Sequence, residues 1–383
     1  MNQLGSFLTA ESSEGDVLLT VRKELQTVAR DALGGQAGSV VALDPRDGSI
    51  LAMYSNPSFD PNVLSDNDTE RATAAKELYE AVDDKPLLAH TYRERYFPGS
   101  TFKVVTAMAG LADGTVTRDT PVYPVVTEYK PPLTTRAISN FGGSSCGGTL
   151  FVVLARSCNS SFAQMAVEQI GAEDMIATAE AVGFNSTPPL DLPNPADSTF
   201  PDDFGEVVSE PEGLAPVNED APALAQSAIG QNDVAATPLQ MALVAAAVAN
   251  GGDIMTPHVL SAVRARDGDV VTSYEPAVWL RAAEASVAAT MREAMVGVVT
   301  DGTASVMQVP GFEVGAKTGT AQLGTERPTS HAWMIAFGGP PVGSQRSRCP
   351  WWSPTSTARA TRPVVGWRGP WPRGARRCAR SRA

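Results

Sequence analysis

Hydrophobic positions recur at two different spacings along the chain, which predicts a mixture of helices and strands. One helix is predicted by apolar residues at helical spacing, namely Leu25, Val28, Ala29, Ala32 and Leu33. Gly34 and Gly35 then end this helix. Two β-rich stretches follow at about 39–43 and 49–55, and the turn sequence DPRDG joins them. The pattern therefore predicts a helix followed by a pair of neighbouring strands.

The rest of the chain alternates between helical patterns and loops. Helices are expected within residues 66–84, 104–111, 150–170, 173–182, 239–249 and 282–299. Residues 120–150 predict a loop or irregular hairpin, and residues 184–222 predict a long loop, because both are rich in turn-forming residues. The sequences GFEVGAKTGTAQLG and HAWMIAFG predict two further neighbouring strands. No internal repeat is present in the sequence.

Composition narrows the classes of function. The chain has 383 residues and a net charge of −12, which argues against a nucleic-acid partner. His90, His258 and His331 are far apart, and no Cys/His cluster has zinc spacing, so we expect no metal. No stretch approaches the roughly 20 apolar residues of a membrane span. The start, MNQLGSFLTAESSEGD, lacks the basic region of a signal peptide.

The last 45 residues have a different composition. Residues 339–383 contain ten Arg but no Lys, Asp, Glu, Leu, Ile, Met, Phe or Tyr, and they hold four of the six Trp. Without those ten charges the first 338 residues carry −22. We interpret this tail as the product of a reading-frame slip near Gly338–Gly343, followed by disordered sequence. A natural disordered basic tail is the alternative.

One serine and one lysine are separated by a single helical turn. In YFPGSTFKVVTA, Lys103 follows Ser100 by three residues, so both side chains share a helix face. The chain has six Lys against 24 Arg, and only lysine can lose its proton inside a protein. A desolvated Lys103 can therefore take the Ser100 proton and activate a nucleophile. A surface Ser and Lys on a helix is the alternative interpretation.

Two further motifs follow in the chain. Lys317-Thr318-Gly319-Thr320 lies on a predicted strand, where the glycine lets a ligand approach the backbone and the charge and hydroxyls can hold an anion. Taken alone, it also suits an edge strand. Ser157-Cys158-Asn159 precedes a helical pattern and could simply cap that helix. A literal S-D-N occurs at residues 65–67, but it precedes Ser100 and is interpreted as a chance match.

These motifs, in the order S-x-x-K, S-x-N and K-T-G, resemble those of the serine penicillin-recognising enzymes. VVALDPRDGSILAMYSNPSFDPN, SAIGQNDVAATPLQMALVAAAVANGG, MTPHVL and VVTDGTAS resemble segments of class B penicillin-binding proteins. The resemblance implies an α/β (α+β) transpeptidase fold over residues 15–338, with a central antiparallel sheet, flanking helices and a mostly helical subdomain. Residues 1–14 are then the remnant of an N-terminal region.

The resemblance also implies a mechanism. Ser100 attacks the bond between two D-alanines of a peptidoglycan stem peptide, Lys103 is the base, and the Ser100 and Thr320 N–H groups form the oxyanion hole. Ser157 bridges Lys103 and Lys317 and relays the proton to the leaving D-alanine, and Asn159 holds the substrate amide and the Lys103 amine. Thr318, Gly319, Thr320 and Lys317 bind the substrate end. Peptidoglycan and β-lactams are the expected ligands, with no cofactor and, as further partners, cell-wall synthesis or division proteins.

Several expectations remain open at this stage. Cys146 and Cys158 either form a disulfide or are two unrelated thiols. A serine β-lactamase or D,D-carboxypeptidase is the alternative enzyme, and a β-lactam sensor or inactive product is the alternative outside catalysis. Family members act at the outer face of the plasma membrane and carry an N-terminal membrane helix. Because this sequence shows no such helix, we expect this chain to be a fragment. The tail offers no central last strand and no C-terminal helix, which predicts instability.

Overall fold

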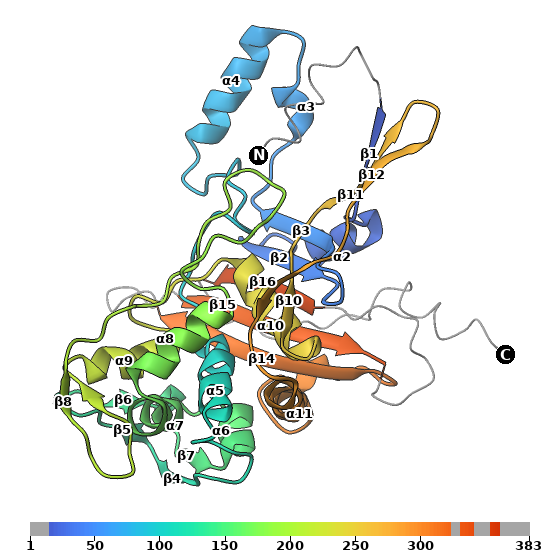
Figure 1. Cartoon of the computed structure of the whole chain (residues 1–383). Helices are drawn as coiled ribbons and strands as arrows, with labels where there is room; N and C mark the ends of the chain where they lie inside the picture. Colours follow the sequence, from blue (N-terminus) through green and yellow to red (C-terminus); the bar gives the residue numbers. More distant parts are fainter. Residues whose placement is uncertain (1–14, 323–329, 341–352, 361–383) are drawn as a thin grey trace.

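A five-stranded antiparallel sheet forms the centre of the computed structural model, which describes residues 15–322, 330–340 and 353–360. The strands follow one another across the sheet in the order β14, β15, β16, β2 and β3 (Figure 1). Their bounds are Glu313–Gln322, Ser330–Gly339, Ser353–Ala360, Gly38–Leu43 and Ile50–Asn56. The two predicted strand pairs therefore exist, and a fifth strand lies between them.

Side chains along β2 point alternately to the two faces of the sheet, and both faces are covered. Val40 and Ala42 pack in a small cluster with Ala29 and Leu33 of α2 (Lys23–Leu33). Val41 and Leu43 point to the other side and belong to the main core. Successive side chains of a strand face opposite ways, so one strand serves two layers. The main-core side is covered by the predicted helices α10 (Pro238–Ala249) and α11 (Ala285–Thr300).

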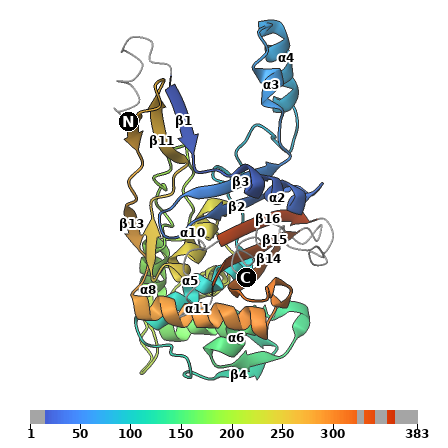
Figure 2. The ribbon, with the colours of Figure 1, turned by 90° about the vertical axis from the view of Figure 1, so that its right-hand side faces the viewer.

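A mostly helical region lies beside the sheet, with α10 and α11 between them (Figures 1 and 2). It begins with the 3₁₀ turn η1 (Gly99–Thr101) and α5 (Lys103–Ala112). Its other helical segments are α6 (Leu150–Arg156), α7 (Asn159–Gln164), the π-helix η3 (Met165–Ile170), α8 (Ala172–Ala181) and α9 (Ala221–Ser227). Short hairpins complete it: β4 (Tyr123–Val126) with β7 (Cys146–Gly148), β5 (Glu128–Tyr129) with β6 (Ile138–Ser139), and β8 (Val207–Ser209) with β9 (Val217–Asn218).

Smaller elements project from this body. Helices α3 (Pro61–Leu64) and α4 (Thr69–Glu80) form an excursion at the top of Figure 1, and neither contains a buried residue. A second sheet, not predicted from the sequence, joins β1 (Gly15–Leu19), β11 (Leu260–Ala265) and β12 (Val270–Ser273). The strands β10 (Asp253–Met255) and β13 (Val278–Arg281) pair with each other, and the turns η2 (Phe141–Gly143) and η4 (Ser305–Met307) are short.

The expectation of a missing central strand is wrong. Ser353–Ala360 forms β16, which pairs with β15 on one side and with β2 on the other. The strand begins after the prolines that argued against it, and Pro354 is only its second residue. Pro354 precedes the ladder with β15, which starts at Thr355, so the missing N–H is tolerated there. The expected C-terminal helix concerns residues 361–383, which lie outside the described part of the chain.

The expected helix over residues 150–170 is not continuous. It breaks at Ser157, which adopts the left-handed conformation with φ 61° and ψ 42°. An α-helix cannot run through such a residue, so α6 ends there and α7 begins at Asn159. The break places two polar side chains of the S-x-N motif at a helix junction. No helix in the described residues is long and apolar enough to cross a membrane.

Candidate active site

Ser100 lies in a turn that only glycines allow to form. Gly99 has φ +53°, and its N–H donates to the Gly230 carbonyl, with an N···O distance of 2.9 Å. A Cβ on Gly99 would lie 2.7 Å from the Thr320 carbonyl oxygen, so the turn packs directly on β14. Ser100 is half-buried and follows at once. This contact brings the two N–H groups expected to form an oxyanion hole, those of Ser100 and Thr320, into neighbouring segments.

Lys103 is completely buried at the start of α5. Its Nζ donates to the Ser157 carbonyl at 2.8 Å and to Asn159 Oδ1 at 2.7 Å, and it lies 3.4 Å from Ser157 Oγ. Burial, with a further contribution from the positive charge of Lys317, lowers the pKa of Lys103 well below its ordinary value. A neutral amine one helical turn from a serine can accept the serine proton.

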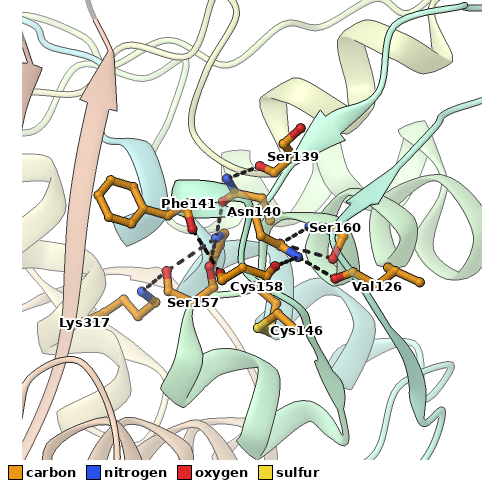
Figure 3. The surroundings of a disulfide bond; sticks show 12 residues. Val126, Ser139, Asn140, Phe141, Cys146, Ser157, Cys158, Ser160 and Lys317 are labelled. Carbon is orange, nitrogen blue, oxygen red and sulfur yellow. Dashed lines mark hydrogen bonds between the residues drawn. A yellow bond between two sulfur atoms is a disulfide. The ribbon is translucent and has the colours of Figure 1, made fainter. Parts of the chain in front are cut away.

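The helix junction after α6 presents Ser157 to Lys317 (Figure 3). It also presents Asn159 to Lys103. Ser157 Oγ accepts a hydrogen bond from Lys317 Nζ at 2.8 Å and also lies near Lys103 Nζ. Asn159 is fixed from both ends, because Oδ1 accepts from Lys103 and Nδ2 donates to the Ser139 carbonyl at 2.9 Å. One hydroxyl group therefore connects two buried amines.

A disulfide and a buried amide hold this junction in place. Cys146 of β7 is bonded to Cys158, the residue between the two polar members of the motif, with a Cα–Cα distance of 5.5 Å. The Asn140 side chain accepts from the Ser160 N–H at 2.9 Å and donates to the Val126 carbonyl at 2.9 Å (Figure 3). Of the two alternatives for these cysteines, the structure has the disulfide.

The strand β14 carries the third motif. Lys317 is fully buried, and desolvation lowers its pKa to about 7. Thr318 points to the other face, where its hydroxyl lies 2.7 Å from the hydroxyl of Thr303. Thr320 is exposed. The site thus combines two lysines of lowered pKa with threonine hydroxyls at its edge.

Gly319 does not leave open space for a ligand, as its sequence context suggested. A Cβ at this position would lie 2.9 Å from the Pro98 carbonyl oxygen and 2.9 Å from Thr101 Cγ2. The glycine instead lets the serine turn approach the strand closely. The physical reason is that Gly319 faces the same side of β14 as Lys317, and η1 already fills that side.

The structure brings Ser100, Lys103, Ser157, Asn159 and the Lys317–Thr320 strand together, although up to 220 positions separate them in the sequence. The literal S-D-N at residues 65–67 lies on the α3–α4 excursion, outside this group. The sequence did not predict that Asn140, Gly230 and Thr303 hold the site residues in place. Only the SAIGQ and VVTDGTAS segments gave a signal for the latter two.

Known peptidoglycan transpeptidases are similar to most of this chain. The peptidoglycan D,D-transpeptidase PbpA of Mycolicibacterium smegmatis is 36% identical over 349 residues, which cover 88% of this chain and 67% of the relative. The protein of the same name from Mycobacterium tuberculosis is 35% identical, with the same coverage.

Solved structures show the same likeness. The ceftriaxone acyl-enzyme complex of penicillin-binding protein A from M. tuberculosis superposes with a TM-score of 0.79 at 31% identity, covering 93% of this chain and 77% of that one. The D,D-transpeptidase domain of a peptidoglycan glycosyltransferase from Eggerthella lenta gives 0.74 at 29% identity, covering 90% and 78%. Residues 38–338 match the family model "Penicillin binding protein transpeptidase domain", and the chain belongs to this family.

Proposed function

We propose that this chain is a peptidoglycan D,D-transpeptidase that binds penicillin and works through an acyl-enzyme on Ser100. The observation that carries this proposal is the junction of Lys103, Ser157 and Lys317, in which two buried amines of lowered pKa share one hydroxyl. Through such a junction a proton can pass from one side chain to the next without being released to bulk water. Its position beside a serine turn supports acyl transfer.

In the acylation step, Ser100 Oγ attacks the carbonyl carbon of the peptide bond between two D-alanines. The Ser100 proton passes to the neutral Lys103 amine, and the oxygen that gains negative charge accepts hydrogen bonds from the backbone N–H groups of Ser100 and Thr320. The C–N bond breaks, and Ser157 passes the proton from Lys103 to the leaving D-alanine amine. The products are an ester on Ser100 and free D-alanine.

Substrate recognition uses the groups around the serine. Asn159 holds the amide of the stem peptide, while Lys317, Thr318 and Thr320 bind the terminal carboxylate. Thr303 orients the Thr318 hydroxyl through their 2.7 Å contact. The amine of a second stem peptide then attacks the ester, which releases Ser100 and forms the cross-link. A β-lactam takes the place of the D-alanine pair and remains as a stable ester.

The names of the relatives support transpeptidation over the β-lactamase and D,D-carboxypeptidase alternatives, because those relatives are D,D-transpeptidases. They also support a place in peptidoglycan synthesis. We extend the proposal to the outer face of the plasma membrane, with cell-wall synthesis or division proteins as further partners. A β-lactam sensor would use the same serine but would transfer no peptide. Product analysis therefore distinguishes these functions.

The test is labelling of the full chain by fluorescent penicillin, compared with Ser100→Ala and with Ser65→Ala as a matched control. Ser65 belongs to the S-D-N sequence, is exposed and lies between α3 and α4 in the α3–α4 excursion. We expect labelling in the wild type and in Ser65→Ala but not in Ser100→Ala. Incubation with a pentapeptide donor and an amine acceptor should yield D-alanine and a cross-linked product. Labelling that persists in Ser100→Ala would contradict the proposal, and hydrolysed donor alone would indicate a carboxypeptidase.

A further inference from the structure

We propose that Trp333 is a positioning residue for the nucleophile turn and sets the distance between Ser100 and β14. This inference rests on the proposed role of Ser100 as the nucleophile. Trp333 itself lies on β15, the strand next to β14, and its indole acts through the backbone of the segment that precedes Ser100.

The strand register directs Trp333 toward the site. Trp333 is the cross-strand partner of Gly319, and Ile335 is the partner of Lys317. Directly opposed residues of an antiparallel pair share a face, so Trp333 lies on the same side as Lys317 and the close approach at Gly319. Its side chain is only 3% exposed. Its Nε1–H donates to the Phe97 carbonyl, with an N···O distance of 2.8 Å.

The segment before Ser100 is tied down on this side by further contacts. Tyr96 exchanges two backbone hydrogen bonds of 2.9 Å with Ala236. The Tyr96 ring packs edge-on against the indole of Trp333 at 6.4 Å and against the ring of His331 at 4.9 Å between centroids. Only two residues lie between Phe97 and Ser100. A bond that fixes the Phe97 carbonyl therefore fixes the start of the serine turn.

Two opposing constraints then define the turn. Gly319 sets how closely the turn can approach β14, because Pro98 and Thr101 already fill the space where a Cβ would lie. Trp333 holds the preceding carbonyl to the neighbouring strand and so keeps the turn pressed against the sheet. Without the indole N–H, the Phe97 carbonyl loses this anchor, and the turn can move away from Thr320 and Lys317. Acyl transfer is sensitive to such displacement, since reacting groups must be held at near-contact distances.

The experiment replaces the indole N–H and measures acylation in two parts. In the full chain, Trp333 is changed to phenylalanine and, by nonsense suppression, to 3-benzothienylalanine, which keeps the bicyclic shape but has sulfur instead of N–H. Trp279→Phe is the matched control, because Trp279 lies on β13 and contacts Gly183 rather than the serine turn. The concentration dependence of labelling by fluorescent penicillin separates the dissociation constant Kd from the acylation rate constant k2.

We expect k2 to fall about tenfold in both Trp333 variants, with Kd within twofold of wild type. Trp279→Phe should keep the wild-type k2. A merely structural role would lower the melting temperature and leave k2 of the folded fraction unchanged, and that result would overturn the proposal. Should Trp333→Phe fail to fold, the benzothienyl variant decides, because it preserves packing. The Ser100→Ala result is independent of this outcome, so failure of the Trp333 proposal leaves the proposed function standing.

Discussion

Replacing Gly319 by alanine inserts one methyl group between the serine turn and β14. The new Cβ would lie 2.9 Å from the Pro98 oxygen and 2.9 Å from Thr101 Cγ2, whereas ordinary contacts begin near 3.4 Å. Neither atom can move aside easily. The Pro98 oxygen belongs to the backbone. The other belongs to a buried threonine whose Oγ1 donates to the Pro98 carbonyl at 2.7 Å. The turn and the strand must therefore separate by about 0.5 Å, which is the difference between the 2.9 Å contact and an ordinary contact of 3.4 Å.

This separation moves Ser100 away from the Thr320 N–H and from Lys317. We expect the rate of acylation to fall by roughly 10- to 100-fold, since displacements of this order weaken aligned reacting groups strongly. The free energy of unfolding should fall by about 1–3 kcal/mol, which is typical of one extra methyl group in a packed site. Labelling by fluorescent penicillin gives the rate, and urea unfolding gives the free energy.

Gly297→Ala is the matched control for the same chemical change. Gly297 lies inside α11 with no atom within 4 Å of its expected Cβ, so alanine should raise stability by roughly 0.5–1 kcal/mol and leave acylation unchanged. The steric reasoning is refuted if Gly319→Ala acylates within twofold of wild type. It is also refuted if both alanine variants lose acylation equally.

Three further predictions follow from the lysines and the disulfide. Lys103→Arg should lose at least about 100-fold in acylation at every pH, because arginine cannot become a neutral base. In the wild type, the lowered Lys103 pKa should keep labelling active to a lower pH than a lysine of ordinary pKa would allow, and labelling should fall as acid protonates the amine. An Arg variant that labels normally would exclude this role. The pKa of Lys317 is about 7 in the fold and 10.5 without burial, so the unfolded chain binds more protons between these values and stability rises with pH there. Urea unfolding of Lys317→Met should show a slope lower by up to about 1.4 kcal/mol per pH unit, and an unchanged slope would contradict the shift. Changing Cys146 and Cys158 together to serine should lower the unfolding free energy by about 3 kcal/mol, whereas equal stability with and without reductant would argue that the disulfide contributes little.

The sequence predicted most elements that surround the site because their patterns are local. The periodicity before Gly34, the strand pair around the DPRDG turn and the apolar stretch at 239–249 each depend on neighbouring residues, and the structure has all three. The expectation that the tail supplies no central strand was wrong for a related reason. Composition and proline positions disfavour an isolated strand, but Ser353–Ala360 gains hydrogen bonds from β15 and β2 on both sides. Hydrogen bonding to strands on both sides can therefore produce a strand where the local sequence preference for strand is weak.

The chemical groups of the site can be read from the sequence alone: a serine and a lysine one turn apart, a second lysine on a predicted strand, and two cysteines twelve residues apart. How these groups meet depends on the packing of distant segments. The left-handed Ser157, the convergence of Lys103 and Lys317 on its hydroxyl, and the use of Gly319 against the serine turn all involve segments far apart in the chain. The same holds for the lowered pKa values, because desolvation depends on what surrounds a side chain, and no local pattern specifies those surroundings.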